Sequence, residues 1–262
     1  MIFALLLTGC QTQPAAETPQ PAEEVELNVF AAASLTETFE QIGKLFEAAN
    51  PGVKVIFTFD SSGTLKTQIE EGALADVFVS AAQEQMNQLE AGNAANTEGL
   101  DFIQTDTRLN IVENKVTLTV PSGNPKGVKT FADLASDSVT IIALGNSDVP
   151  VGQYSEELLI NLGIWEQIQP KITFGSNVKE VTTWVSEGVA DCGIIYKTDA
   201  FSANLEVVAE AGTDLLKTPV VYPGAVLKNT QHPAEANAFL DFLRSAEVQA
   251  ILTGVGFSIP EN

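Results

Sequence analysis

The sequence predicts an α/β protein built from two doubly wound units, in which helices cover both faces of a parallel sheet. Short runs rich in Val, Ile and Phe alternate with amphipathic stretches, a pattern typical of strand–helix–strand units. The alternation occurs in two successive series along the chain. The 262 residues, of which 45% are hydrophobic and 18% are charged, are enough for one or two domains with substantial cores.

The first series starts with a predicted strand at residues 26–32, ELNVFAA. Apolar residues at helical spacing follow as far as Asn50, where an Asn-Pro-Gly sequence stops the helix because proline cannot continue it. The remaining elements of this series alternate in the same way. They are a strand at 53–59, a short helix at 64–72, a strand at 76–82, and a helix around Met86 and Leu89 that Gly92 closes.

The second series has a similar construction. Its predicted elements are strands at 115–123, 139–145 and 191–196, a helix at 155–163, and a helix bearing Val181, Trp184 and Val185. A further strand at 220–228 and an amphipathic helix around Phe239, Leu240 and Leu243 precede a short tail. Periodicity alone leaves open whether these last elements return to the first unit.

The charge balance excludes some classes of partner. The chain has 34 acidic against 13 basic residues and a formal net charge of −21, and Arg108 and Arg244 are its two arginines. Such a surface repels polyanions, so neither nucleic acid nor an acidic membrane surface is an expected partner.

The N-terminal segment, residues 1–10, ends an apolar run with Leu-Thr-Gly-Cys and resembles the lipobox of bacterial lipoproteins. The resemblance implies that Cys10 is lipidated and anchors the protein in the periplasm or on the outer face of the cell membrane. The alternative is a buried strand with a chance cysteine. Residues 11–25 are rich in Pro, Gln and Glu and predict a flexible tether. With lipid on Cys10, Cys192 has no intramolecular disulfide partner.

Two strand-to-helix joints carry small residues and a serine, Ser34 in FAAASLTETF and Ser62 in FDSSGTLK. Ligands of open parallel sheets bind at the carboxyl ends of the strands, where helices begin. The N–H groups at a helix start bind anions, and the two serine hydroxyls would add donors to them. Gly63 and the neighbouring alanines keep the backbone accessible to a ligand.

Helix capping is the alternative explanation for each serine. Ser34 with Glu37 fits a capping box, and Ser62 before Leu65 can be explained in the same way. Two similar joints with small neighbours favour a binding site over two separate caps.

The second series offers matching features. Pro150, Val151 and Gly152 stand at one predicted helix start, and Asn177 with Val178 stands at another, so their backbone amides are candidate donors. Tyr196 ends a predicted strand, where its hydroxyl is a candidate neutral donor. The alternative for Tyr196 is half-buried packing.

The sequence argues against catalysis and against a metal cofactor. The G-x-S-x-G pattern of a nucleophile elbow is absent around both serines, and a Ser-His-Asp mechanism would depend on His232, the single histidine. One histidine and two distant cysteines give no ligand cluster for a metal cation, so no cofactor is expected. No P-loop sequence occurs, which places any transport ATPase on another polypeptide.

From about Leu27 to Pro260 the chain resembles the periplasmic molybdate-binding proteins of ABC importers. The resemblance lies in FAAASLTETF, FDSSGTLKTQIEEGALADVFVSA, DVPVGQYSEELL, SNVKEV and GIIYKTDA, in that order. It implies the type II periplasmic binding protein fold, in which two α/β lobes joined by a hinge close on an oxyanion. It further implies that residues 26–104 and 220–262 form lobe I and that residues 105–219 form lobe II.

The same resemblance implies roles for five residues. Ser34 and Ser62 would donate through hydroxyl and backbone N–H, Val151 and Val178 through backbone amides, and Tyr196 through its hydroxyl. The implied ligand is molybdate or tungstate, and the implied partners of this monomer are a permease and its separate ATPase. The alternatives are a binding protein for sulfate, thiosulfate or another tetrahedral oxyanion, and a serine hydrolase.

Two aspartates lie close to these residues in the sequence. An ionised carboxylate that pointed at the ligand would repel an anion. We therefore expect Asp60 and Asp148 to face solvent.

Overall fold

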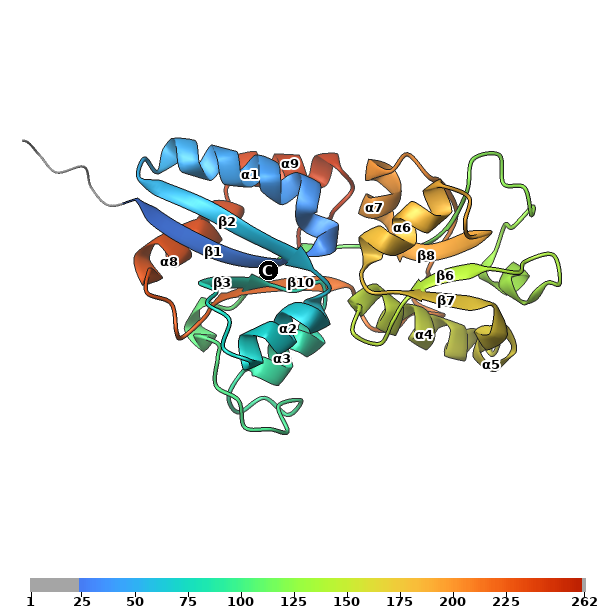
Figure 1. Cartoon of the computed structure of the whole chain (residues 1–262), viewed down its shortest axis with the longest axis horizontal. Helices are drawn as coiled ribbons and strands as arrows, with labels where there is room; N and C mark the ends of the chain where they lie inside the picture. Colours follow the sequence, from blue (N-terminus) through green and yellow to red (C-terminus); the bar gives the residue numbers. More distant parts are fainter. Residues whose placement is uncertain (1–23, 261–262) are drawn as a thin grey trace, which may run out of the picture.

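A computed structural model describes residues 24–260, which form two lobes, each a five-stranded sheet with helices on both faces (Figure 1). The predicted two-lobed α/β architecture is confirmed. The segment 1–10 with Cys10, and most of the tether, lie outside the described residues. The first strand begins at Val25, the last residue of the predicted tether. No helix within residues 24–260 is long and apolar enough to cross a membrane.

The first lobe contains both ends of the described chain. Its sheet has the strand order β2-β1-β3-β10-β4. These strands are β1 (Val25–Ala32), β2 (Val53–Asp60), β3 (Val77–Val79), β4 (Leu109–Glu113) and β10 (Val221–Val226). The helices of this lobe are α1 (Thr36–Ala49), α2 (Ser62–Glu70), α3 (Gln83–Leu89), α8 (Pro233–Leu243) and α9 (Ala246–Gly254), with short 3-10 turns at Ala33–Leu35 and Thr105–Thr107.

The second lobe repeats the plan with the order β7-β6-β8-β5-β9. Its strands are β5 (Val116–Val120), β6 (Ile142–Gly145), β7 (Ile172–Gly175), β8 (Cys192–Tyr196) and β9 (Glu206–Glu210). Its helices are α4 (Pro150–Leu162), α5 (Trp165–Ile168), α6 (Val178–Ser186) and α7 (Lys197–Ser202), with 3-10 turns at Phe131–Ala135 and Gln169–Lys171.

The chain crosses between the lobes twice. It leaves the first sheet after Glu113 and enters the second at Val116, and it returns between Glu210 and Val221. The predicted boundary at 104/105 assigned β4 to lobe II, whereas β4 pairs with β10 in the first sheet. Two apolar strands separated by two residues look alike in sequence whether they pair as a hairpin or lie in different sheets.

Each sheet is mixed, because one antiparallel strand lies among its parallel strands. β1, β2 and β3 are parallel, as are β6, β7 and β8. β10 and β5 run antiparallel to their neighbours because each enters its sheet directly from a crossing, at the end where the parallel strands finish. The parallel strands of the first lobe end toward the second lobe (Figure 1), which brings the helix starts of both lobes to the interlobe boundary.

Candidate functional site

A small cavity lies between the lobes at the ends of these strands. Its volume is about 10 Å³. A cavity that holds one water molecule has a volume of ~10–15 Å³, so this cavity is about the size of a single water. The lining combines residues from both lobes, and none of them has a basic side chain. These residues are Ala32, Ala33, Ser34, Asp60, Ser61, Ser62, Ala81, Val149, Pro150, Val178 and Tyr196.

Ser62 lies at the start of α2 and is fully buried. The cap of α2 is its neighbour Ser61, whose hydroxyl accepts the N–H of Thr64 at 3.1 Å, so capping does not explain Ser62. The Ser62 oxygen instead accepts the N–H of Ala81 at 2.9 Å. That bond leaves the hydroxyl proton of Ser62 for an acceptor in the cavity.

Ser34 lies in the 3-10 turn between β1 and α1. The capping box considered as the alternative for Ser34 is absent, because Leu35 precedes α1 as its N-cap and no side chain caps the helix. The Ser34 hydroxyl is 2.9 Å from the hydroxyl of Tyr222, a buried residue of β10. Ser34 and Ser62 thus come to the same cavity from two neighbouring strand-to-helix joints.

The second lobe contributes the first turns of α4 and α6. Pro150 begins α4 and has no N–H, and the Gly152 N–H is bonded to Val149 O, so the free amide of this turn is that of Val151. Val178 begins α6 after its cap Asn177, which accepts the N–H of Glu180 at 3.1 Å. Val178 is among the residues that line the cavity, whereas Val151 is not.

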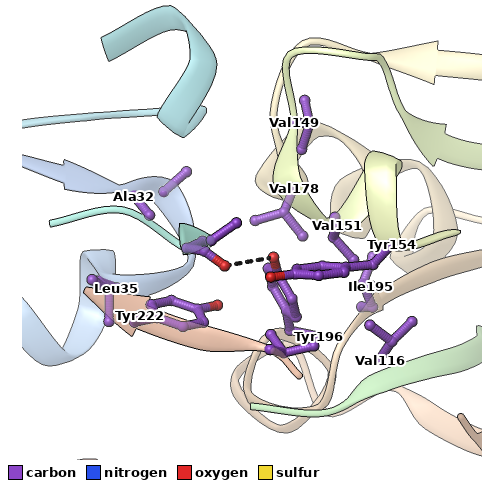
Figure 2. Packing of buried hydrophobic residues seen from close by; sticks show 14 of the residues in the cluster. Ala32, Leu35, Val116, Val149, Val151, Tyr154, Val178, Ile195, Tyr196 and Tyr222 are labelled. Carbon is purple, nitrogen blue, oxygen red and sulfur yellow. Dashed lines mark hydrogen bonds between the residues drawn. The ribbon is translucent and has the colours of Figure 1, made fainter. Parts of the chain in front are cut away.

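Tyr196 ends β8, its side chain lies among the buried residues at the interlobe boundary (Figure 2), and it lines the cavity. Its hydroxyl donates to the carbonyl oxygen of Ala81 in the first lobe at 3.4 Å, a long contact that an incoming anion could replace. Burial raises the pKa of Tyr196 well above its ordinary value. The phenol therefore stays protonated and can act as a neutral donor.

The two nearby aspartates differ in position. Asp148 is exposed, as expected. Asp60 is half-buried and lines the cavity, so the expectation that it faces solvent was wrong. One oxygen of its carboxylate, Oδ1, accepts the backbone N–H of Ser61 at 2.7 Å and is 3.4 Å from the side-chain nitrogen of Asn177.

Direct contacts join the rims of the two lobes. The N–H of Gly63 donates to the carbonyl oxygen of Asp148 at 3.0 Å, and Gln85 donates to Gln153 at 3.1 Å. The Lys179 ammonium reaches the Glu37 carboxylate at 2.7 Å. These contacts place the lobes in a closed arrangement over the cavity.

Sequence reasoning missed three residues at this site. Ser61 caps α2, and Tyr222 and Asn114 are hydrogen-bonded to each other behind Ser34. Tyr222 stands in an apolar strand, where its hydroxyl gives no sequence signal. His232 lies before α8 and is not among the residues that line the cavity. Within residues 24–260, no group of three or more His, Cys, Asp or Glu is placed to hold a metal ion.

Comparison with known proteins places this geometry in a family. Residues 27–258 match the model of the bacterial extracellular solute-binding proteins. The chain is 34% identical to the "Putative ABC transporter substrate-binding lipoprotein YvgL" of Bacillus subtilis, over 97% of this chain and 94% of the relative. It is 34% identical to the molybdate-binding protein ModA of Haemophilus influenzae, over 90% and 91% of the two chains.

A solved structure gives the same fold. The periplasmic molybdate-binding protein of Azotobacter vinelandii superposes with a TM-score of 0.77 over 90% of this chain and 100% of that chain, at 23% identity. The predicted type II periplasmic binding protein fold is thereby confirmed. The chain belongs to the family of bacterial extracellular solute-binding proteins.

Proposed function

We propose that this protein is the substrate-binding component of an ABC importer and that it captures molybdate or tungstate between its lobes. The observation that carries the proposal is the convergence of uncharged donors from both lobes on one cavity without a basic side chain. Ser34, Ser62 and Tyr196 offer hydroxyls, and Val151 and Val178 offer backbone amides. Relatives with molybdate-binding names at 34% identity support the choice of ligand.

Neutral donors suffice for a dianion. At physiological ionic strength the Debye length is about 8 Å, so most of the net charge of −21 is screened from the cavity. Hydrogen bonds to a charged group contribute about 1.5–3 kcal/mol each, and five of them can reach the ~8 kcal/mol of a micromolar complex after ordering costs. Selection against the smaller sulfate would then depend on cavity size.

The transport partners follow from this role. A permease would recognise the closed arrangement of the lobes, and its ATPase is a separate polypeptide because the chain has no P-loop. Lipid on Cys10 would hold the protein, as a monomer, at the outer face of the membrane. The protein would bind and deliver its ligand without catalysing a reaction.

Calorimetric titration of the purified protein with molybdate, tungstate, sulfate and phosphate tests the assignment. We expect tight binding of the first two anions and weak binding of the others. Sulfate binding as tight as molybdate binding would instead assign the protein to the sulfate class. Hydrolysis of an ester that disappeared in Ser34→Ala would revive the hydrolase alternative.

Ser34→Ala and Ser62→Ala should each weaken molybdate binding by about 10- to 100-fold, because each removes one hydrogen bond to a charged ligand. Titration of each variant measures the loss. Ser186→Ala is a matched control, since Ser186 is exposed and bonded only within α6. If both site variants bound like the control, the proposed site would be wrong.

Tyr196→Phe should weaken molybdate binding by about 5- to 30-fold, the equivalent of the ~1–2 kcal/mol of one buried donor. The ring keeps its contacts with Tyr154 and Tyr222, so the thermal midpoint of the free protein should change little. An unchanged dissociation constant would show that the hydroxyl keeps its Ala81 partner in the complex.

A further inference from the structure

A chain of buried hydrogen bonds leads to Ser34 from the second lobe. The side-chain nitrogen of Asn114 is 2.9 Å from the hydroxyl of Thr198 and 3.2 Å from that of Tyr222. The Tyr222 hydroxyl is in turn 2.9 Å from that of Ser34. All four side chains are buried. Asn114 lies at the first crossing between the lobes, and Tyr222 follows the second.

The direction of this chain can be derived from Asn114. Its side-chain oxygen accepts the N–H of Lys115 at 2.8 Å, which fixes the orientation of the amide. Both protons of the amide nitrogen are then directed at Thr198 and Tyr222. Tyr222 therefore accepts a hydrogen bond from Asn114.

The Tyr222 proton must go to Ser34. Among the described residues the hydroxyls and amides within hydrogen-bonding distance of the Tyr222 hydroxyl are those of Asn114 and Ser34, and Asn114 is already the donor in the first pair. If Ser34 donated to Tyr222 instead, the phenol proton would be buried without an acceptor, at a cost of about 1–3 kcal/mol. With Tyr222 as donor, the Ser34 oxygen accepts, and its own proton is left for the cavity.

The Ser62 hydroxyl is also left with its proton free for the cavity, but through a different hydrogen bond. Its oxygen accepts a backbone N–H, that of Ala81, so the main chain itself makes Ser62 a donor. At Ser34 the equivalent bond comes from a side chain that can be replaced. A cavity whose hydroxyls can only donate suits an anion whose oxygens can only accept.

We propose that Tyr222, held by Asn114, is a positioning residue that locks Ser34 as a hydrogen-bond donor and thereby excludes oxyanions that carry a proton, such as hydrogen phosphate. The proposal rests on the oxyanion-binding function proposed above. A protonated oxyanion must donate one hydrogen bond, and hydroxyls that are all committed as donors offer it no hydroxyl acceptor. Release of Ser34 would supply that acceptor.

Tyr222→Phe tests the proposal by calorimetric titration with molybdate and with phosphate at mildly alkaline pH, where hydrogen phosphate predominates. The ring keeps its contacts with Tyr196 and Phe257. Molybdate binding should weaken while hydrogen phosphate binding is unchanged or strengthens, so that the affinity ratio falls about tenfold. Equal weakening of both anions would assign Tyr222 a packing role only and overturn the proposal.

A second variant pair shows whether Tyr222 acts through Ser34. In the double variant Ser34→Ala/Tyr222→Phe, the ratio of molybdate to hydrogen phosphate affinity should equal that of Ser34→Ala alone, because the hydroxyl that Tyr222 orients is gone. If Tyr222→Phe lowered the affinity ratio of the Ser34→Ala protein as much as it lowers that of the wild type, the proposal would be overturned. Tyr154→Phe is the matched control: this buried tyrosine has its hydroxyl 3.5 Å from Pro219 O and bonds neither serine, so the ratio should stay at the wild-type value.

Asn114→Asp is an independent test of the proposal if Tyr222→Phe folds poorly. The carboxylate would accept the phenol proton, which would free Ser34 and lower the ratio in the same direction. A wild-type ratio in folded Asn114→Asp would contradict the proposed orientation. Wild-type protein that bound neither molybdate nor tungstate would instead overturn the proposed function itself, which separates the two failures.

Discussion

Gly63→Ala is expected to weaken molybdate binding by about 10- to 100-fold, because a methyl group at this position prevents full closure. Gly63 is in the first turn of α2, where its N–H meets the carbonyl oxygen of Asp148 across the interlobe boundary at 3.0 Å. An added Cβ would lie 2.4 Å from that oxygen and 2.9 Å from the Asp148 Cα. These are backbone atoms, so the contact is relieved only if the lobes move apart.

The first lobe itself should tolerate the change. The backbone of Gly63 is helical, and alanine is favoured over glycine in a helix by up to ~1 kcal/mol. Small-angle X-ray scattering with saturating molybdate should therefore show a larger radius of gyration for Gly63→Ala than for the wild type, at an undiminished thermal midpoint of the free protein. The loss of molybdate affinity in Gly63→Ala would then come from incomplete closure of the lobes and not from a less stable first lobe.

Gly254→Ala is the matched control for this experiment. An added Cβ at Gly254, the last residue of α9, has no neighbouring atom within 4 Å. It adds the same methyl group away from the cavity and should leave the affinity unchanged. Equal affinities of the Gly63 and Gly254 variants would mean that the Gly63 contact with Asp148 is not part of the ligand-bound state.

Local pattern predicted the alternating α/β elements and the position of the candidate site, whereas the return of the last elements to the first lobe was implied by the family resemblance. The alternation of strand and helix periods separates elements along the chain, and strands that run parallel bring their following turns to one edge. Ser34, Ser62, Val178 and Tyr196 each follow or end such an element, and the structure brings all four to one cavity. This part of the site follows from chain geometry alone.

The rest depends on contacts that leave no local signal. Ser34 and Tyr222 are 188 positions apart in the sequence, and Asn114 and Tyr222 are 108 positions apart. The sequence around these three residues gives no sign that they are hydrogen-bonded to one another. The capping alternative for Ser62 fails for a different reason. Ser61 and Ser62 are adjacent and chemically identical, so only the exact start of α2 decides which of them caps it.

Three charged side chains, those of Asp199, Lys179 and Glu37, are linked at the rim of the cavity. The Asp199 carboxylate is 0% exposed, and the Lys179 ammonium lies 3.0 Å from it. Apart from this ammonium, neither Asp199 oxygen has a hydrogen-bond partner among the described residues. Lys179 also reaches Glu37 of the first lobe at 2.7 Å. One cation thus neutralises a fully buried carboxylate and contacts the opposite lobe.

The pKa values of this pair reflect burial and attraction together. Burial alone lowers the pKa of Lys179, but the carboxylates of Asp199 and Glu37 outweigh it and leave the pKa above its ordinary value. Burial raises the pKa of Asp199, and Lys179 offsets only part of that rise. The folded protein therefore holds the Asp199 proton more tightly than the unfolded chain does, so this carboxyl lowers stability as pH rises from its unfolded pKa through its folded one.

Lys179→Met should lower the free energy of unfolding at neutral pH by about 3–5 kcal/mol, because it leaves Asp199 buried without a cation. Methionine keeps most of the apolar stem, so packing changes little. Urea denaturation of the ligand-free protein measures the loss. Lys197→Met is the matched control, since Lys197 pairs with Glu210 at the same 3.0 Å but both side chains are 40% or more exposed, and it should cost less than about 1 kcal/mol.

The pH dependence distinguishes a lost ion pair from lost packing. Without Lys179 the pKa of Asp199 rises further, so the destabilisation of Lys179→Met should be small in acid, where Asp199 is protonated in both proteins, and should grow as pH rises. A packing defect would cost the same at every pH. A pH-independent loss in Lys179→Met would therefore show that Lys179 stabilises the fold through its stem and not through its charge.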